Sequence, residues 1–301
     1  MTVADVGVAI VTYNSAAEIG DCLAALTMAS RAPLQIVVVD NASQDQTLSI
    51  VHATAPHVMV IPNSSNRYYA AASNQGIAAI DAPFVLLLNP DAAVPPGGVD
   101  ALRQFLERHP DAAAVAPRLI GPDGRRQPSL RELPGLDTLW YDFTGLSVLF
   151  PRSRIFGRWR MGYFNGAQER IVPQPMASCL LVRREVFTEI GGFDESYPMF
   201  FNDVDWCRRT ALAGLWIYYT PEVSVRHTGG AAVNRRKVRM IWMSHYAYFV
   251  YLHRLYATRP LMRALVWISA PALFASAIVR SVWWGPLRRM LVGRSSYRGG
   301  N

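Results

Sequence analysis

The segment LLLNPDAAV, residues 86–94, joins an apolar strand to a carboxylate. Phe84 to Leu88 form an unbroken apolar run, which is typical of a strand covered on both faces of a parallel sheet. The run stops at Asn89, Pro90 and Asp91, and a proline cannot donate to a sheet ladder. We therefore predict a strand over residues 84–88 that presents Asp91 at the rim of a sheet, where water and cations can reach it.

Apolar strands alternate with helices before this segment. The predicted strands are Val6–Thr12, Gln35–Val39 and Val58–Ile61, and the predicted helices are Ala16–Met28 with Ser15 as N-cap, one opened by residues 41–45, and Ala70–Ala79. Such alternation predicts a parallel sheet, which binds ligands beyond the carboxyl ends of its strands. We expect the polar groups that follow these strands to line one crevice, although a turn or a helix cap would explain any one of them alone. These groups are Thr12-Tyr13-Asn14, Asp40-Asn41 and Asn89-Pro90-Asp91.

The composition allows one large or two modest domains, because 51% of the 301 residues are hydrophobic and 17% are charged. No basic flank precedes the first apolar strand, so we expect no secretory signal. Cys22, Cys179 and Cys207 lack metal-ligand spacing and cannot all pair with one another. Their pattern indicates buried thiols in a reduced, cytosolic environment.

The net charge of +8 is concentrated at the C-terminal end of the chain. From Arg235 onward the chain holds twelve of its 30 Lys and Arg residues and none of its 22 Asp and Glu residues. The first 234 residues are therefore mildly acidic, with a net charge of −4. The overall charge alone would suit a nucleic-acid binder, but this distribution argues against one and predicts a basic extension instead.

The C-terminal extension carries aromatic and apolar helical patterns. Aromatic residues recur at three-to-four spacing over Ile241–Tyr256, which fits a helix packed on the rest of the protein as well as a membrane-facing helix. Residues 264–279 are apolar but contain Pro271, and a full span needs about 20 apolar residues. With Trp283-Trp284 and the arginines, this favours an interfacial or re-entrant membrane anchor. We expect a globular domain over residues 1–234 and a membrane-associating region over residues 235–301.

The middle of the chain gives weaker signals. Residues 125–170 mix arginines, aromatics and glycines without a clear period, and we interpret them as a mobile loop over the crevice. Leu215–Tyr219 and Val223–His227 are predicted to be two short strands.

An acidic cluster opens the helix that precedes these strands. Asp203 and Asp205 stand near its predicted start, where helix-capping carboxylates are common. The aromatic neighbours Phe201 and Trp206 would partly desolvate Asp203, which suits a general base whose pKa must rise. His227 by itself reads as an ordinary strand-end histidine, but beside Asp91 it would offer a divalent cation an imidazole and a carboxylate.

The order of these motifs resembles the family 2 inverting glycosyltransferases of GT-A fold, and within them the bacterial rhamnosyltransferase branch. The resemblance covers about residues 5–230 and rests on VAIVTYN (8–14), VVVDNASQDQT (37–47), NRYYAAASNQGI (66–77), LLLNPDA (86–92), CLLVRREVFTEIGGFDE (179–195), FFNDVDWCRR (200–209) and VRHTGG (225–230). It implies an α/β fold with a Rossmann-like, mostly parallel sheet. A nucleotide half and an acceptor half would share that sheet, with a C-terminal helical membrane-associated extension.

Laid on the matching positions, the resemblance implies three sets of site residues. The nucleotide-sugar contacts would be Thr12, Tyr13, Asp40, Asn66, Asn74, Asn89 and Asp91. Asp40 would bind the pyrimidine base. The metal ligands would be Asp91 and His227, holding Mn²⁺ or Mg²⁺, and Asp203 would be the catalytic base.

The same resemblance implies a metal-dependent, inverting transfer of a sugar at the cytoplasmic face of a bacterial plasma membrane. The donor it favours is dTDP-rhamnose, and the acceptor is a lipid-linked or glycolipid hydroxyl. Two alternatives stay open: another nucleotide sugar such as a UDP-sugar, and a degenerate protein that binds a nucleotide sugar without catalysis.

The sequence departs from the family pattern at four places. Asn202 and Trp206 stand where Glu and Leu are usual, and Ala177 lies where a Gly is usual before the strand. Arg67-Tyr68-Tyr69 replaces small and apolar residues, a change that could alter the sugar donor. Losing the Glu charge beside Asp203 would lower the pKa of this carboxyl slightly.

Overall fold

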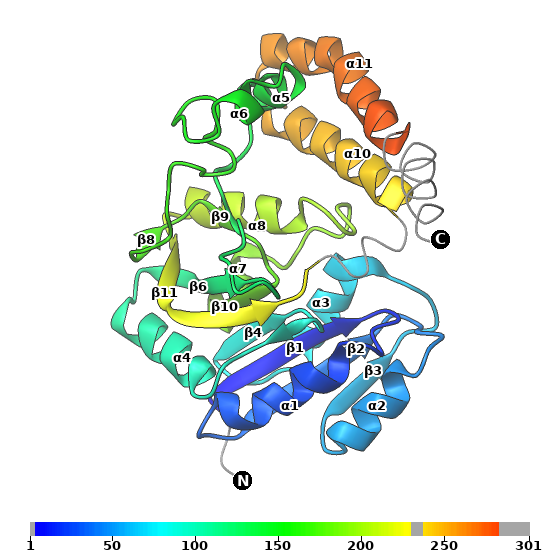
Figure 1. Ribbon diagram of the computed structural model, residues 1–301, viewed down its shortest axis with the longest axis vertical. Helices are drawn as coiled ribbons and strands as arrows, with labels where there is room; N and C mark the ends of the chain where they lie inside the picture. Colours follow the sequence, from blue (N-terminus) through cyan, green and yellow to red (C-terminus); the bar gives the residue numbers. More distant parts are fainter. Residues whose placement is uncertain (1–3, 230–236, 283–301) are drawn as a thin grey trace, which may run out of the picture.

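One large sheet organises the part of the chain that the computed structural model describes, residues 4–229 and 237–282 (Figure 1). Over these residues the sheet has nine strands in the order β3-β2-β1-β4-β10-β6-β11-β5, with β8 paired to β11, and β7 and β9 form a separate ribbon. The strands are β1 Val6–Thr12, β2 Leu34–Asp40, β3 Met59–Pro62, β4 Phe84–Leu88, β5 Ala92–Ala93, β6 Ala112–Ile120, β7 Leu130–Arg131, β8 Arg170–Ile171, β9 Gln174–Pro175, β10 Cys179–Arg183 and β11 Trp216–His227.

Helices cover both faces of this sheet and extend beyond one end of it (Figure 1). They are α1 Ile19–Ala29, α2 Thr47–Thr54, α3 Tyr68–Ala78, α4 Gly98–Arg108, α5 Leu136–Phe143, α6 Leu146–Leu149, α7 Arg184–Ile190, α8 Asn202–Leu212, α10 Lys237–Leu255 and α11 Pro260–Val282.

The four N-terminal strands confirm the parallel arrangement that the sequence predicts. β1 pairs in parallel with β2 and with β4, and β2 pairs in parallel with β3. β10 then enters antiparallel between β4 and β6, and β6 pairs in parallel with β11. The sheet is therefore mostly parallel, with the carboxyl ends of β1, β2 and β4 at one edge.

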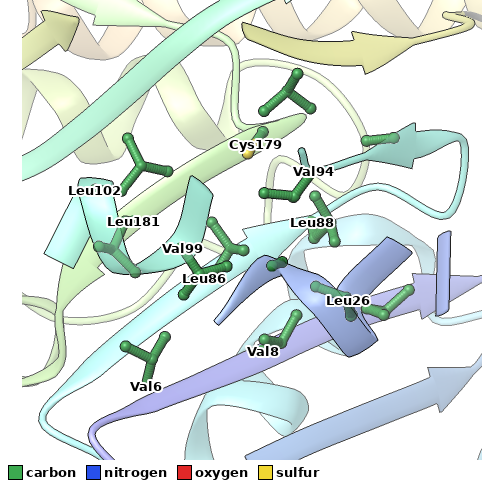
Figure 2. Packing of buried hydrophobic residues seen from close by; sticks show 14 of the residues in the cluster. Val6, Val8, Leu26, Leu86, Leu88, Val94, Val99, Leu102, Cys179 and Leu181 are labelled. Atoms are coloured by element: carbon green, nitrogen blue, oxygen red, sulfur yellow. The ribbon is translucent and has the colours of Figure 1, made fainter. Parts of the chain in front are cut away.

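The unbroken apolar run of β4 is explained by two cores on opposite faces of the sheet. Leu86 and Leu88 pack into one core with residues of α1 and α4, as Figure 2 shows around Leu26, Val99 and Leu102. Val85 and Leu87 point into the other core, which includes residues of α3, α7 and α8. Because successive side chains of a strand alternate between faces, a strand buried on both faces needs apolar residues throughout.

Three local predictions were wrong. α1 begins at Ile19, and the Ser15 hydroxyl does not cap it; the Ser15 carbonyl instead accepts the N–H groups of Glu18 and Ile19. Residues 125–170 are not a loop throughout, because they contain α5 and α6. The two strands predicted before His227 form one strand, β11, with an irregularity in its pairing between Thr220 and Ser224.

A third core joins α10 and α11 to α5 and to the first turn of α8. Its buried members include Leu139, Phe201, Tyr248, Tyr251 and Val266. By length and composition alone, α11 could cross a membrane. The division into domains at residue 234 stays a prediction. The motif residues Arg235-Arg236 and Trp283-Trp284 lie outside the described residues.

Candidate active site

The carboxyl ends of β1 and β2 hold Thr12 and Asp40 side by side, as their parallel register requires. The Thr12 hydroxyl donates to Oδ1 of Asp40 at 2.7 Å, and the Ser43 hydroxyl donates to the same oxygen at 2.6 Å. The Ser43 N–H donates to Oδ2 at 2.9 Å. A carboxylate has about four acceptor positions. The three bonds above leave about one acceptor position of the buried Asp40 for a ligand. Tyr13 lies half-buried directly after this pair.

Two asparagines were predicted near the nucleotide. Asn66 lies close to the carboxyl ends of β1 and β2, which hold Thr12 and Asp40, whereas Asn74 forms hydrogen bonds with the backbone of Phe193. Asn66 Oδ1 accepts the N–H of Tyr68 at 2.7 Å, and the neighbouring Asn41 amide donates to the Tyr68 carbonyl at 3.0 Å. The Asn74 amide both donates to the carbonyl and accepts the N–H of Phe193, each at 2.9 Å. Its geometry positions the segment around Phe193, and a direct nucleotide contact by Asn74 stays a prediction.

Asp91 and His227 meet at the same edge, because β5, just after Asp91, pairs with the end of β11. His227 Nε2 lies 3.3 Å from Oδ1 of Asp91. Oδ2 of Asp91 accepts the N–H of Gly229 at 2.9 Å. Burial alone would raise the pKa of Asp91, but His227 and the Gly229 N–H outweigh it and hold this pKa below its ordinary value.

Gln127 fixes the orientation and the tautomer of His227. Its side-chain Nε2 donates to the His227 carbonyl at 2.7 Å, and its Oε1 lies 2.8 Å from Nδ1 of the same histidine. Since a carbonyl oxygen only accepts, the amide group on it must be the NH₂, and Oε1 must then accept from Nδ1. Nδ1 therefore carries a proton, and Nε2 is the ring nitrogen that faces Asp91.

This pair fits a divalent cation. The buried Nε2 of His227 makes no hydrogen bond, although it lies close to the carboxylate. A carbonyl or carboxylate that fixes the second nitrogen is the usual arrangement of a metal-binding histidine, and the Gln127 amide oxygen supplies the equivalent here. Over residues 4–229 and 237–282 no three His, Cys, Asp or Glu side chains gather around one point. Asp91 and His227 are the two candidate ligands that lie together among the described residues, and Mg²⁺ sites commonly combine one or two protein ligands with substrate phosphates.

Asp203 lies in the first turn of α8, directly after the tight corner at Phe201, whose φ is 68°. Its Oδ1 accepts the N–H of Val204 at 2.9 Å, and its Oδ2 accepts Nε2 of Gln174 at 3.1 Å. Burial raises the pKa of Asp203; these backbone contacts and the more distant Arg131 offset that rise only in part. A carboxylate with a raised pKa suits a general base.

The sheet edge connects Asp203 to the Asp91–His227 pair. The N–H of Asn89, two residues before Asp91, donates to the Ser178 carbonyl at 2.9 Å. The preceding residue, Ala177, contributes a backbone hydrogen bond to Asp203. From the other side, Gln127 holds His227, and Arg131 pairs in β7 with Gln174, the residue that holds Asp203. A short series of contacts thus links the segment that holds Asp203 to the segments that hold Asp91 and His227.

Gln127, Arg131 and Gln174 are site residues that sequence reasoning missed. They lie in or beside the segment without clear period, and no local pattern marks an amide that will meet a histidine some 100 positions away. Ser43 and Asn41 lie inside the quoted motif after the second strand, so their position past the strand end was the available signal.

Asn202 also has a structural explanation. It is buried, and its Nδ2 donates to the Tyr197 carbonyl at 3.1 Å. A glutamate could not donate to that carbonyl, so the amide is matched to the local backbone.

Comparison with known proteins gives relatives of one kind. The family model "Glycosyl transferase family 2" matches residues 7–191. An N-acetylglucosaminyl-diphospho-decaprenol L-rhamnosyltransferase of Mycobacterium tuberculosis is 32% identical over 259 residues, covering 80% of this chain and 82% of that protein.

Two solved structures share the fold. The mannosyltransferase PcManGT of Pyrobaculum calidifontis, in complex with GDP-Man and Mn²⁺, matches with a TM-score of 0.56 at 19% identity, over 98% of this chain and 81% of that one. TarS 1–349 of S. aureus in complex with UDP matches with a TM-score of 0.53 at 18% identity, over 91% and 81%. These likenesses confirm the predicted GT-A architecture.

Proposed function

Because the chain belongs to glycosyl transferase family 2, we propose that it moves L-rhamnose from dTDP-rhamnose to a lipid-linked or cell-envelope glycan acceptor. That the protein is a glycosyltransferase follows from its family and its relatives. The choice of donor and acceptor is supported by the mycobacterial relative, whose name specifies rhamnose transfer to a diphospho-decaprenol-linked N-acetylglucosamine.

The observation that supports the proposal is the contact between Asp91 and His227, together with the backbone contacts through Asn89, Ser178 and Ala177 that link this pair to the segment holding Asp203. In the proposed reaction Asp203 accepts the proton of the acceptor hydroxyl as the hydroxyl oxygen attacks the anomeric carbon. The bond from that carbon to the nucleoside diphosphate breaks in the same displacement, so the anomeric configuration inverts. One catalytic carboxylate is enough for this chemistry, and no covalent enzyme intermediate forms.

Asp91 and His227 are proposed to hold Mn²⁺ or Mg²⁺. Such an ion, when bound, neutralises negative charge on a diphosphate leaving group. The contribution of the chain is the fixed pair of ligands: the β5–β11 pairing positions them, and Gln127 holds the His227 ring with Nε2 towards Asp91.

The nucleotide is proposed to lie over the Thr12–Asp40 corner, with Tyr13 and Asn66 beside it and Asn89 towards the diphosphate. Asp40 can accept a hydrogen bond from the imide N–H of thymine or of uracil alike. A UDP-sugar is therefore the second candidate donor.

The acceptor is proposed to approach from the Asp203 side. Arg131 lies there with its guanidinium bonded to the carbonyls of Pro128 and Leu130, and within the described residues it forms no ion pair. Such a cation suits a phosphate of a lipid-linked acceptor. The reaction would then take place at the cytoplasmic face of a bacterial plasma membrane, beside α10 and α11.

The test is a panel of nucleotide sugars offered to the full chain with bacterial membrane extract and Mn²⁺ or Mg²⁺, with Asp203→Ala as the control. We expect transfer from dTDP-rhamnose that chelation abolishes and that the variant lacks. If only a different nucleotide sugar supports transfer, that sugar is the donor and the assignment of dTDP-rhamnose is wrong. Nucleotide-sugar binding without transfer from any donor would identify a degenerate, non-catalytic protein.

A further inference from the structure

The α5–α6 segment, residues 136–155, exposes large apolar side chains on the part of the chain that precedes the basic extension. Val148 and Leu149 are 76% and 70% exposed, far above what a packed helix shows. The exposed set is Trp140, Phe143, Val148, Leu149, Phe150 and Ile155. Six large exposed apolar side chains within one segment of 20 residues indicate an interaction surface.

This segment is joined to α11. Trp140 Nε1 donates to the Ser269 hydroxyl at 3.1 Å, and Leu139 shares the third core with Val266 and Leu273. Figure 1 shows α5, α6 and α11 together at the end of the molecule opposite the N-terminus. The apolar patches of the two elements therefore belong to one rigid unit.

The outward side of α11 is as apolar as the α5–α6 segment. Val266, Ser269, Leu273 and Ala277 recur at three-to-four spacing and are buried. The opposite arc carries the exposed side chains Leu261, Leu265, Ile268, Val279 and Val282. The two charged residues of α11, Arg263 and Arg280, lie near its two ends.

The charges around this surface favour an anionic partner. The acidic residues of the α5–α6 segment are both neutralised: Asp137 pairs with Arg158 at 2.8 Å, and Asp142 pairs with Arg160 at 2.5 Å. Arg152 and Arg259 are exposed beside the apolar patch. From Arg235 onward the sequence adds only cations. Apolar side chains ringed by arginines and tryptophans match the headgroup zone of an acidic bilayer.

We propose that the α5–α6 segment and the outward face of α11 form one surface that inserts into an anionic lipid bilayer. The inference deepens the proposed function and rests on it, because the lipid-linked acceptor is part of that proposal. It assigns membrane contact to a segment that lies far from the C-terminal extension in the sequence but packs against it in the fold, so docking depends on both elements.

The same unit reaches the proposed base. Phe201, directly before α8, stacks on Tyr248 of α10 with ring centroids 5.1 Å apart. The Tyr248 hydroxyl donates to the carbonyl of Gly135, at the start of α5, at 3.1 Å. A bilayer on this surface would therefore lie at a fixed position relative to Asp203, which suits an acceptor hydroxyl carried on a lipid.

The experiment measures co-sedimentation of the full chain with vesicles of equimolar phosphatidylcholine and phosphatidylglycerol. Leu149→Glu should weaken binding at least ~10-fold, since burying a leucine contributes about 1.5–3 kcal/mol and 1.4 kcal/mol is tenfold. Met28→Glu is the matched control, because Met28 is also an exposed helical side chain, at 64%, but lies on α1. Equal binding by Leu149→Glu and wild type overturns the proposal, as does an equal loss in Met28→Glu.

A second measurement keeps the test independent of variant folding. The native cysteines are buried, so an environment-sensitive dye can be attached to Val148→Cys, with Met28→Cys as the reference. Vesicles should shift the emission of the dye at residue 148 to the blue and leave the dye at residue 28 unchanged. No shift at residue 148, or self-association through this face without vesicle binding, overturns the proposal. Neither assay contains donor or acceptor, so failure of the proposed transfer reaction would leave their result intact.

Discussion

Asp91 and Asp203 are the same residue type with pKa values moved in opposite directions. At Asp91 the neighbouring His227 and a backbone N–H outweigh burial and lower the pKa. At Asp203 burial dominates and raises it. Two carboxyls whose surroundings separate their pKa values can take two roles in one site, as we propose for Asp91, a cation ligand that stays ionised, and Asp203, a base that takes up a proton.

The pH dependence of transfer follows from the raised pKa of Asp203. A general base works only when deprotonated, so kcat/KM should fall as the pH decreases through that raised pKa. We expect the acid limb of the pH–rate profile to lie clearly above the ordinary aspartate value of about 3.9. A rate that stays constant down to that ordinary value would contradict the assignment.

Gln127 should act through His227 and not on the substrate. Gln127→Leu removes the acceptor for the Nδ1–H of His227, so the ring and its tautomer are no longer fixed. The variant should bind Mn²⁺ roughly 10–100-fold more weakly. Electron paramagnetic resonance of free Mn²⁺, titrated with protein and nucleoside diphosphate, measures this directly. Gln104→Leu, on the exposed side of α4, is the control and should bind like wild type. If Gln127→Leu binds Mn²⁺ as tightly as wild type, Gln127 does not position His227 for the cation.

At the scale of elements, the strands of the N-terminal parallel half were predictable, and the short strands and helices in the middle of the chain were not. β1 and β4 have the predicted bounds because two-sided burial leaves an unbroken apolar run. The polar residues after each strand were predictable for the same reason. α5 and α6 have only eight and four residues, too few for a helical period to stand out in the sequence. The amide contacts of Gln127 and Gln174 depend on pairing between distant segments, which no local pattern encodes.

Arg209 ties α8 to the turn that follows α7, so it should matter for stability. Its guanidinium donates to the carbonyls of Ile190, Gly191 and Gly192 and to Oδ2 of Asp205. Arg209→Met should lower the free energy of unfolding by about 2 kcal/mol, because the carbonyls lose a charged donor. Denaturant unfolding measures this difference.

The control is the preceding residue on the same helix. Arg208→Met removes the same charge but none of the bonds to the 190–192 turn, and it should change the unfolding free energy by less than about 0.5 kcal/mol. An equal loss of unfolding free energy in the two variants would show that the loss comes from the removed charge and not from the hydrogen bonds of Arg209 to the 190–192 turn.

At the scale of the whole molecule, three proposed regions follow one another in space. They are the nucleotide site at Thr12 and Asp40, the catalytic residues Asp91, His227 and Asp203, and the apolar surface of α5, α6 and α11. The sheet fixes the first two, and the third core joins α8 to α5, α10 and α11. This arrangement would suit the proposed reaction, in which a soluble sugar nucleotide and a lipid-borne acceptor meet at Asp203. The uneven charge of the sequence fits the same proposal, since the cations are concentrated in the C-terminal part of the chain that includes α10 and α11.

Membrane binding should therefore depend on salt and on lipid charge. Each cation near an acidic surface contributes about 1 kcal/mol, and about 1 M salt shortens the screening length to about 3 Å. We expect binding to equimolar phosphatidylcholine–phosphatidylglycerol vesicles to weaken at least ~10-fold at that salt concentration. Equal affinity for pure phosphatidylcholine vesicles would contradict the charge argument.

The most direct test of the account is the single-turnover rate of sugar transfer by Asp203→Asn, compared with Asp205→Asn on the same helix. Asp205 pairs with Arg209 and carries no role in the proposed reaction. The account predicts a loss of roughly 10²- to 10⁴-fold in Asp203→Asn, with donor binding retained, and a rate near wild type in Asp205→Asn. Transfer at the wild-type rate by Asp203→Asn would contradict it.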